Sequence, residues 1–292
     1  MVAPVNNNVS NRPLNVNGKK VEKKVHATIE REMKSLDYAN KKLVEDMILS
    51  YINGDPSFNG HKTVFTRRIK YLSLRLKDPR SSGEALHLTS QFILLDRVRR
   101  SFGIPLKDVR IAGRTPLQPS ALPKGIIDLL NVPSSSGTDY LKYVKNNVEM
   151  VIFANFGSTK ELREYGDNAG VSDPISRTAL INSITYYGPD ETPALYWAMA
   201  SSLVHEAAHI EWDWLNDKDP ADVSSDFAAE RHSYIMKYDF LNDILANLGC
   251  YKLEKHRKVI EATMGQIESV IIEFNKRLGY KAGDFSLKIS SK

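Results

Sequence analysis

The sequence of 292 residues contains one cysteine and no long hydrophobic run. Because Cys250 has no second cysteine to pair with, no disulfide can form within the chain. A stretch of about 18 apolar residues, as in a membrane-spanning helix, is missing. The first twenty residues also lack the apolar core of a secretory signal. We therefore expect a cytoplasmic protein without a membrane partner, or a virion-associated one if a phage encodes it.

The motifs of several enzyme classes are missing too. The sequence has no Gly-x-x-x-x-Gly-Lys phosphate loop and no Gly-x-Gly-x-x-Gly dinucleotide fingerprint. A Gly-x-Ser-x-Gly nucleophile turn is also absent. These absences argue against nucleotide-dependent enzymes and against hydrolases of the serine type.

The composition is that of an ordinary globular protein, with 42% hydrophobic and 26% charged residues. Its charge is uneven, because residues 1–150 contain 25 basic and 14 acidic residues, whereas residues 151–292 contain 15 and 21. A basic half can indicate nucleic-acid binding, but lysines scattered over amphipathic helices are a commoner cause. Since no nucleic-acid-reading motif accompanies the charge, we do not expect nucleic acid as a partner.

The chain divides into three predicted regions. Residues 1–24 lack a sustained apolar period and are predicted to form a flexible basic arm. Residues 25–139 are predicted to be mainly helical and to end in a proline-rich linker. Helices are expected at 25–52, 62–77 and 84–102. The remaining residues, 140–292, form the predicted catalytic domain.

The third region alternates between two patterns. Runs rich in β-branched and aromatic residues predict strands at 148–153 and 178–187. Helical periods follow at 192–214 and 225–248. A last helix carries apolar residues at alternating spacings of four and three, which predicts one stripe packed against the domain or a partner helix. The fold class expected is α+β.

One short segment is typical of metal chemistry: His205-Glu206-Ala207-Ala208-His209. On a helix, histidines four residues apart project from one face and can bind one ion together. Imidazole nitrogen suits Zn²⁺, and a catalytic zinc site needs three protein ligands and an open position for water. Glu206 would then be placed to act as the general base toward that water.

A third ligand must come from elsewhere in the sequence. Glu230 follows His209 after twenty intervening residues, which permits a turn and a return past the ion. Glu230 is therefore the preferred third ligand. His232, Asp226 and Asp213 remain as alternatives.

Neighbours of Glu230 supply candidates for supporting roles. Asp226 and Tyr234 lie four residues before and after it, so all three share one helix face. Asp226 is a candidate for orienting a histidine ligand. Tyr234 or His232 is a candidate for stabilising the oxyanion.

The His-Glu-Ala-Ala-His helix followed by Ala228-Ala229-Glu230 resembles the zincin metallopeptidases whose third ligand is glutamate, the gluzincins. The resemblance covers roughly residues 148–248. It implies a small mixed sheet before the active-site helix, with an edge strand that pairs with an extended peptide. By this resemblance the strand at 178–187 is the edge, and Asn182, Ser183 and Ile184 bind the substrate.

We therefore predict a zinc-dependent metallopeptidase that acts on protein or peptide substrates. The rival hypothesis is a structural or assembly component, for example of a phage particle, that retains a zincin-like fold with or without activity. In that case the N-terminal arm or the final helix would contact a larger protein assembly.

Overall fold

The computed structural model describes most of the chain outside the first thirty residues. The described residues are 15–16, 19–20, 33–34, 36–76, 82–109, 117–118, 122–154, 156, 169–182, 194–216 and 223–287. Within residues 1–24 it describes a single antiparallel pair, β1 (Asn15–Val16) with β2 (Lys19–Lys20). The rest of the predicted arm lies outside the described residues.

The N-terminal region is helical, as predicted. It contains α2 (Tyr38–Ile52), α3 (Phe58–Leu76), α4 (Ser82–Ser101) and the short α5 (Leu106–Val109). Helix α2 begins at Tyr38, where Asp37 caps it by accepting a hydrogen bond from the Asn40 N–H, and residues 25–32 of the helix predicted at 25–52 lie outside the described residues. Apolar periodicity alone cannot locate such a cap.

The sheet has three strands, β3 (Met150–Ala154), β4 (Gly170–Asp173) and β5 (Thr178–Asn182), in the order β3-β5-β4. It is mixed, since β3 runs parallel and β4 antiparallel to β5. The prediction that the strand beginning at Thr178 forms the edge is wrong, because β5 is central and every residue in it is buried. The two edge strands of the described sheet are β3 and β4, and no sequence pattern identified the four residues of β4.

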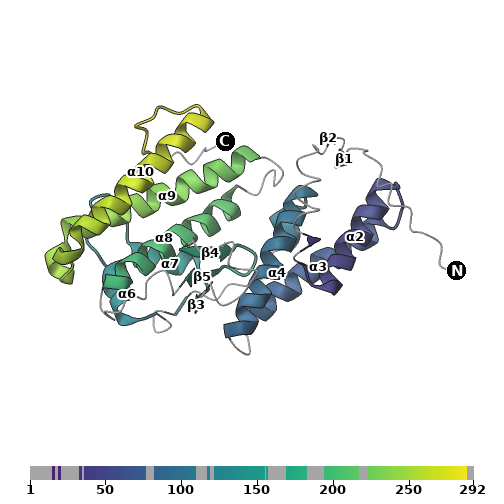
Figure 1. Ribbon diagram of the computed structural model, residues 1–292, viewed down its shortest axis with the longest axis horizontal. Helices are drawn as coiled ribbons and strands as arrows, with labels where there is room; N and C mark the ends of the chain where they lie inside the picture. Colours follow the sequence, from purple (N-terminus) through teal and green to yellow (C-terminus); the bar gives the residue numbers. More distant parts are fainter. Residues whose placement is uncertain are drawn as a thin grey trace.

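Helices cover both faces of this sheet. Figure 1 shows α10 (Arg257–Leu278), α9 (Val223–Ala246) and α8 (Ala194–Leu215) lying in succession above the strands, with α2 to α4 grouped on the other side. Alternate residues of β5 explain the arrangement. Ala179 and Ile181 belong to the hydrophobic cluster around α8, whereas Leu180 belongs to the cluster of α2 to α5.

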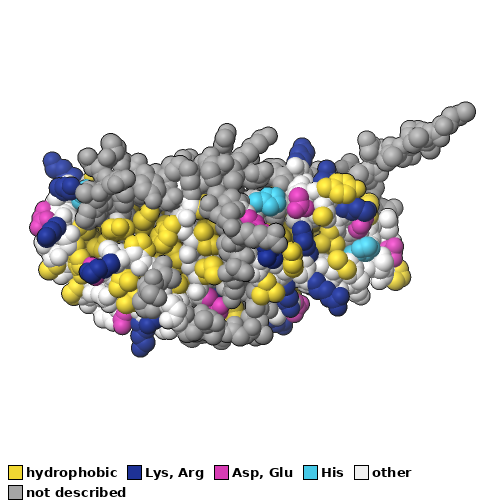
Figure 2. All heavy atoms as spheres, turned by 90° about the horizontal axis from the view of Figure 1, so that it is seen from below, with side chains coloured by type: hydrophobic (Ala, Val, Ile, Leu, Met, Phe, Trp, Pro, Cys, Tyr) yellow, Lys and Arg dark blue, Asp and Glu magenta, His cyan; other side chains and the backbone are white. Residues whose placement is uncertain are grey.

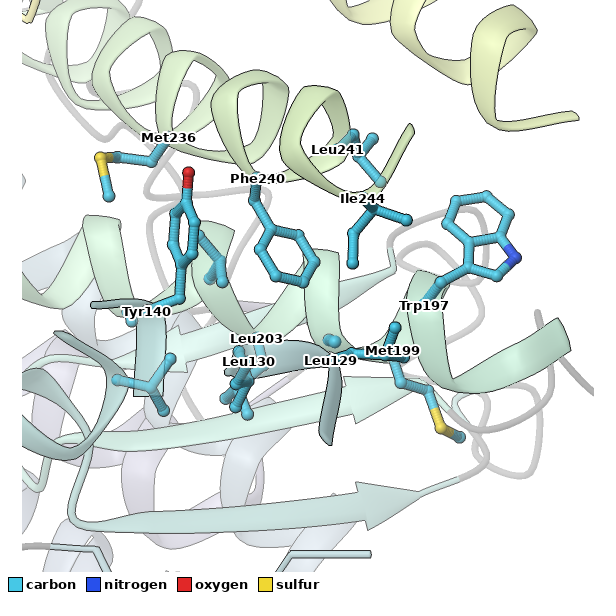
Figure 3. Close-up of a cluster of buried hydrophobic side chains, with 14 of the residues drawn as sticks. Leu129, Leu130, Tyr140, Trp197, Met199, Leu203, Met236, Phe240, Leu241 and Ile244 are labelled. Atoms are coloured by element: carbon cyan, nitrogen blue, oxygen red, sulfur yellow. The ribbon is translucent and has the colours of Figure 1, made fainter. Parts of the chain in front are cut away.

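The cluster around α8 is the larger of the two cores. Figure 3 shows Phe240 and Ile244 of α9 pointing toward Leu203 of α8, with Tyr140 beside Phe240. Tyr140 begins α7 (Tyr140–Asn147), which contacts α8 together with α6 (Lys124–Leu130). Because α6 lies before residue 140, the predicted domain boundary does not coincide with the division between the two cores.

The apolar stripe of the final helix was predicted to pack either against its own domain or against a partner helix. Four residues of the stripe are buried, and α10 packs against α9 of the same chain after two short 3-10 helices, η5 (Leu248–Tyr251) and η6 (Glu254–His256). The stripe residues that are buried are Ile260, Met264, Ile267 and Ile271. The stripe therefore packs inside the domain rather than on a partner helix.

The surface combines residues of both charges. On the face shown in Figure 2, Lys and Arg side chains are scattered among acidic and hydrophobic ones and do not gather into one patch. Among the described helices, none has the length and apolar character needed to cross a membrane.

Candidate metal centre

Helices α8 and α9 bring the predicted metal ligands together. His205 and His209 lie one turn apart on α8, and Glu230 lies in the second turn of α9. His209 faces Glu230, while His205 faces Tyr234 one turn further along α9, so the two helices run antiparallel at this point. Helix α9 thus passes back alongside His205 and His209, as the twenty-residue separation permits.

Three ligand atoms converge between these helices. The Nε2 atoms of His205 and His209 are 3.2 Å apart. Glu230 Oε2 lies 3.4 Å from His209 Nε2 and 3.8 Å from His205 Nε2. Ligands at roughly 2.0–2.1 Å from a tetrahedral Zn²⁺ are about 3.3–3.4 Å from one another. The spacing and the donor set of two imidazoles and one carboxylate therefore fit a zinc ion.

The electrostatics of the three side chains favour a cation between them. Burial and the neighbouring His209 hold the pKa of His205 well below its ordinary value. Burial alone would lower the pKa of His209 too, but attraction to the Glu230 carboxylate raises it to about 9. Burial opposes ionisation of Glu230, whose pKa is nevertheless lowered by His209. The negative carboxylate thus attracts a positive charge to the point where the nitrogens converge.

Glu206 lies beside this centre, buried against β4. A Cβ atom built on Gly170 would come within 2.8 Å of both Cγ and Oε1 of Glu206. Burial raises the pKa of Glu206 to about 7, while His209 and a hydrogen bond from Ser172 act in the opposite direction. A carboxyl group with a pKa near neutrality can accept and release a proton at physiological pH.

Tyr234 also lies at the centre. Its ring packs edge-on against His205, with ring centroids 4.6 Å apart. Burial, together with the carboxylates of Glu230 and Glu206, raises its pKa to about 12, so its hydroxyl remains a hydrogen-bond donor at neutral pH. The structure thus brings five of the predicted site residues together: His205, Glu206, His209, Glu230 and Tyr234.

His232 does not lie at the centre, so its assignment as an oxyanion donor or third ligand is wrong. It points to the opposite side of α9, where its Nε2 lies 3.0 Å from Glu211 Oε2. The same carboxylate oxygen accepts a hydrogen bond of 2.8 Å from the Tyr143 hydroxyl. Glu211 and His232 each lie two residues after a metal-centre residue, which on a helix is close to the opposite face.

The other two alternative ligands have different outcomes. Asp213 Oδ2 lies 3.3 Å from Arg100 Nη2 of α4, and Asp213 does not join the cluster of metal-ligating atoms. The backbone of Asp226 is part of α9, but its side chain lies outside the described residues, as do Ser183 and Ile184. Asn182, the remaining predicted substrate-binding residue, is buried, and its Oδ1 accepts from the Phe156 N–H at 3.3 Å.

A cleft of about 450 Å³ surrounds the centre. Its walls come from α8, α9, the edge strand β4 and, unexpectedly, α4 of the N-terminal region. From α4 it receives Asp96, Arg97 and Arg100, and from α9 it receives Lys237. Sequence reasoning missed these four residues. Spacing from Glu230 would have indicated only Lys237, which lies seven residues later on the same helix face.

Comparisons with known proteins add no family: no protein-family model matches the chain, and neither the curated proteins nor the solved structures include a significant match.

Proposed function

We propose that this chain is a zinc-dependent metallopeptidase of the zincin type that hydrolyses peptide bonds. The observation that carries the proposal is the convergence of His205 Nε2, His209 Nε2 and Glu230 Oε2 within 3.2–3.8 Å, beside a fourth side chain, the buried carboxyl group of Glu206. A site for stability alone would need no such group. The Glu230 side chain is 42% exposed, so the centre is accessible from the cleft.

Each side chain has a role in this proposal. His205, His209 and Glu230 would hold Zn²⁺, which when bound polarises carbonyl groups and lowers the pKa of water. Glu206 accepts a proton from the attacking water and passes it to the departing amine. The Tyr234 hydroxyl donates a hydrogen bond to the oxygen on which negative charge develops. β4, at an edge of the described sheet and in the wall of the cleft, is the strand best placed to pair with an extended peptide.

The experiment combines metal analysis with a Glu206→Gln variant. We expect one zinc per chain in both proteins, because Glu206 is not a ligand. Cleavage of a peptide library, read by mass spectrometry, should fall at least about a hundredfold in the variant. A His209→Ala variant serves as the control that should lose both zinc and cleavage.

Two outcomes would contradict the proposal. Absence of zinc from the wild-type chain would remove the metal centre. Zinc without any cleavage by the wild-type chain would instead favour the rival hypothesis of a structural or assembly component. One argument for that hypothesis was that the final helix could contact an assembly partner. The structure weakens this argument, because the apolar stripe of α10 packs against α9.

A further inference from the structure

The cleft contains more charged side chains than a metal centre requires. Its lining includes four acidic and three basic side chains, so its net formal charge is −1 with neutral histidines. These side chains are Asp96, Glu206, Asp213, Glu230, Arg97, Arg100 and Lys237. A divalent cation would change the net charge to +1. The loaded cleft would therefore attract an anionic group.

Some of these charges already have partners within the protein. Arg100 lies 2.9 Å from Asp96 and 3.3 Å from Asp213, so it joins α4 to α8. Glu230 faces His209 in the metal centre. These contacts explain Arg100 and its two carboxylate partners as well as Glu230, but not Lys237.

Lys237 lies on the same face of α9 as Glu230 and Tyr234, seven and three residues after them. Its side chain is partly buried and lines the cleft. Among the described residues, none forms an ion pair with it; the Glu206 carboxylate attracts its charge, and that charge helps to lower the pKa of His205. Burial lowers the pKa of Lys237, because a charged ammonium group loses solvation there.

We propose that Lys237 binds a carboxylate of the substrate next to the scissile peptide bond. The inference rests on the proposed function, since the substrate is taken to lie in the cleft beside Glu206. A carboxylate supplies the ion-pair partner that Lys237 lacks among the described residues, and a charge-assisted hydrogen bond in a desolvated cleft is strong. The carboxylate belongs to an acidic side chain or to the C-terminus of a peptide.

The test measures peptide binding by the full-length, zinc-loaded Glu206→Gln protein, which should bind peptides without cleaving them. The probe is a randomised hexapeptide mixture in matched forms: Asp against Asn at each position, and a free C-terminal carboxylate against a carboxamide. Affinity selection followed by mass spectrometry gives the enrichment of each charged form over its neutral partner. The two comparisons distinguish a side-chain carboxylate from a terminal one.

We expect one charged form to be enriched about tenfold to a hundredfold, the range for a hydrogen bond between charged groups. Adding Lys237→Met should reduce this ratio to near one, whereas Lys237→Arg should retain much of it. The matched control is Lys258→Met, at an exposed position of α10, which should leave the ratio unchanged. Zinc content and thermal unfolding check that each variant is folded and loaded.

Equal enrichment of charged and neutral peptides would overturn the inference, and so would a carboxylate preference that survives Lys237→Met. If Lys237 only balances the charge of Glu206, its replacement in the otherwise wild-type chain should slow cleavage of all peptides equally. That result would overturn the inference too. Cleavage without carboxylate preference would leave the metallopeptidase proposal intact, whereas absence of zinc would refute that proposal itself.

Discussion

Glu206 lies against β4 at a point where the strand has no side chain. Any residue larger than glycine at position 170 would direct its Cβ atom into the Glu206 carboxylate. This close approach places the Glu206 carboxyl group between the candidate metal ligands and the strand that borders the cleft. It also buries Glu206, and burial is the main cause of its raised pKa.

The first prediction therefore concerns Gly170→Ala. The added methyl group should displace Glu206, reduce peptide cleavage at least about tenfold and lower the free energy of unfolding by about 1–3 kcal/mol. Cleavage assays and urea unfolding measure the two effects. Gly265→Ala on α10 is the control, because no atom lies within 4 Å of its built Cβ and alanine favours helix. Normal cleavage by Gly170→Ala would contradict the role given to this contact.

A second prediction concerns Asp173, at the end of β4. Its carboxylate accepts hydrogen bonds from the N–H groups of Ile175 and Ser176, yet burial raises its pKa to about 6. The folded protein thus binds this proton more tightly than the unfolded chain. The contribution of Asp173 to stability should fall as pH rises from about 4 to 6, by about 2–3 kcal/mol.

Urea unfolding between pH 4 and 7 tests this dependence. The difference in unfolding free energy between wild type and Asp173→Asn should change by that amount across the interval, because asparagine does not titrate. A constant difference across the interval would show that Asp173 does not titrate in this range.

At the scale of secondary structure, α8 and α9 each use two faces for different purposes. One face holds the metal-centre residues. The opposite faces carry Glu211 and His232, which interact with each other and with Tyr143 of α7. This second cluster joins three helices behind the metal centre, so His232 supports the helices without reaching the cleft.

Helix α4 contributes a cleft wall through Arg100. We predict that Arg100→Gln lowers the free energy of unfolding by about 1–3 kcal/mol, because the buried Asp96 and the partly buried Asp213 both lose a charged partner. Peptide cleavage by Arg100→Gln should also fall, because Arg100 holds the α4 wall of the cleft against α8. The control is Arg67→Gln, at an exposed position of α3, where a change within about 0.5 kcal/mol is expected. Equal stability of the two variants would contradict the structural role of Arg100.

At the scale of the whole molecule, the sheet joins two hydrophobic cores. Residues of β5 pack alternately toward α8 and toward the helices α2 to α5. Because the cleft receives side chains from both sets of helices, the N-terminal region forms part of the candidate site. We expect that removing this region would expose one face of the sheet and open the cleft.

Metal binding gives the last prediction. An ion that binds the folded chain alone stabilises it by about 2.7 kcal/mol at a hundred times its dissociation constant. Zinc should therefore raise the melting temperature of the wild-type chain by about 5 °C or more, and a chelator should reverse the shift. Calorimetry with and without zinc measures it. His209→Ala should show no zinc-dependent shift, and an equal shift in that variant would place the ion elsewhere.

Local patterns predicted much of the architecture. Apolar periods indicated the helices that became α3, α4, α8, α9 and α10, and β-branched runs indicated β3 and β5. Patterns of this kind missed β4, because four residues containing glycine and two polar side chains have no strand signature. They also placed β5 at the edge, although its order in the sheet depends on pairing between distant segments.

The sequence by itself determined the helix that carries His205, Glu206 and His209, because a four-residue spacing on a helix fixes a common face. Tertiary structure alone decided that Glu230 faces these histidines while His232 points away, since that depends on how α9 is rotated against α8. It also decided that α4 and β4 wall the cleft. Contacts between distant segments arise from packing of the whole chain, and no local spacing encodes them.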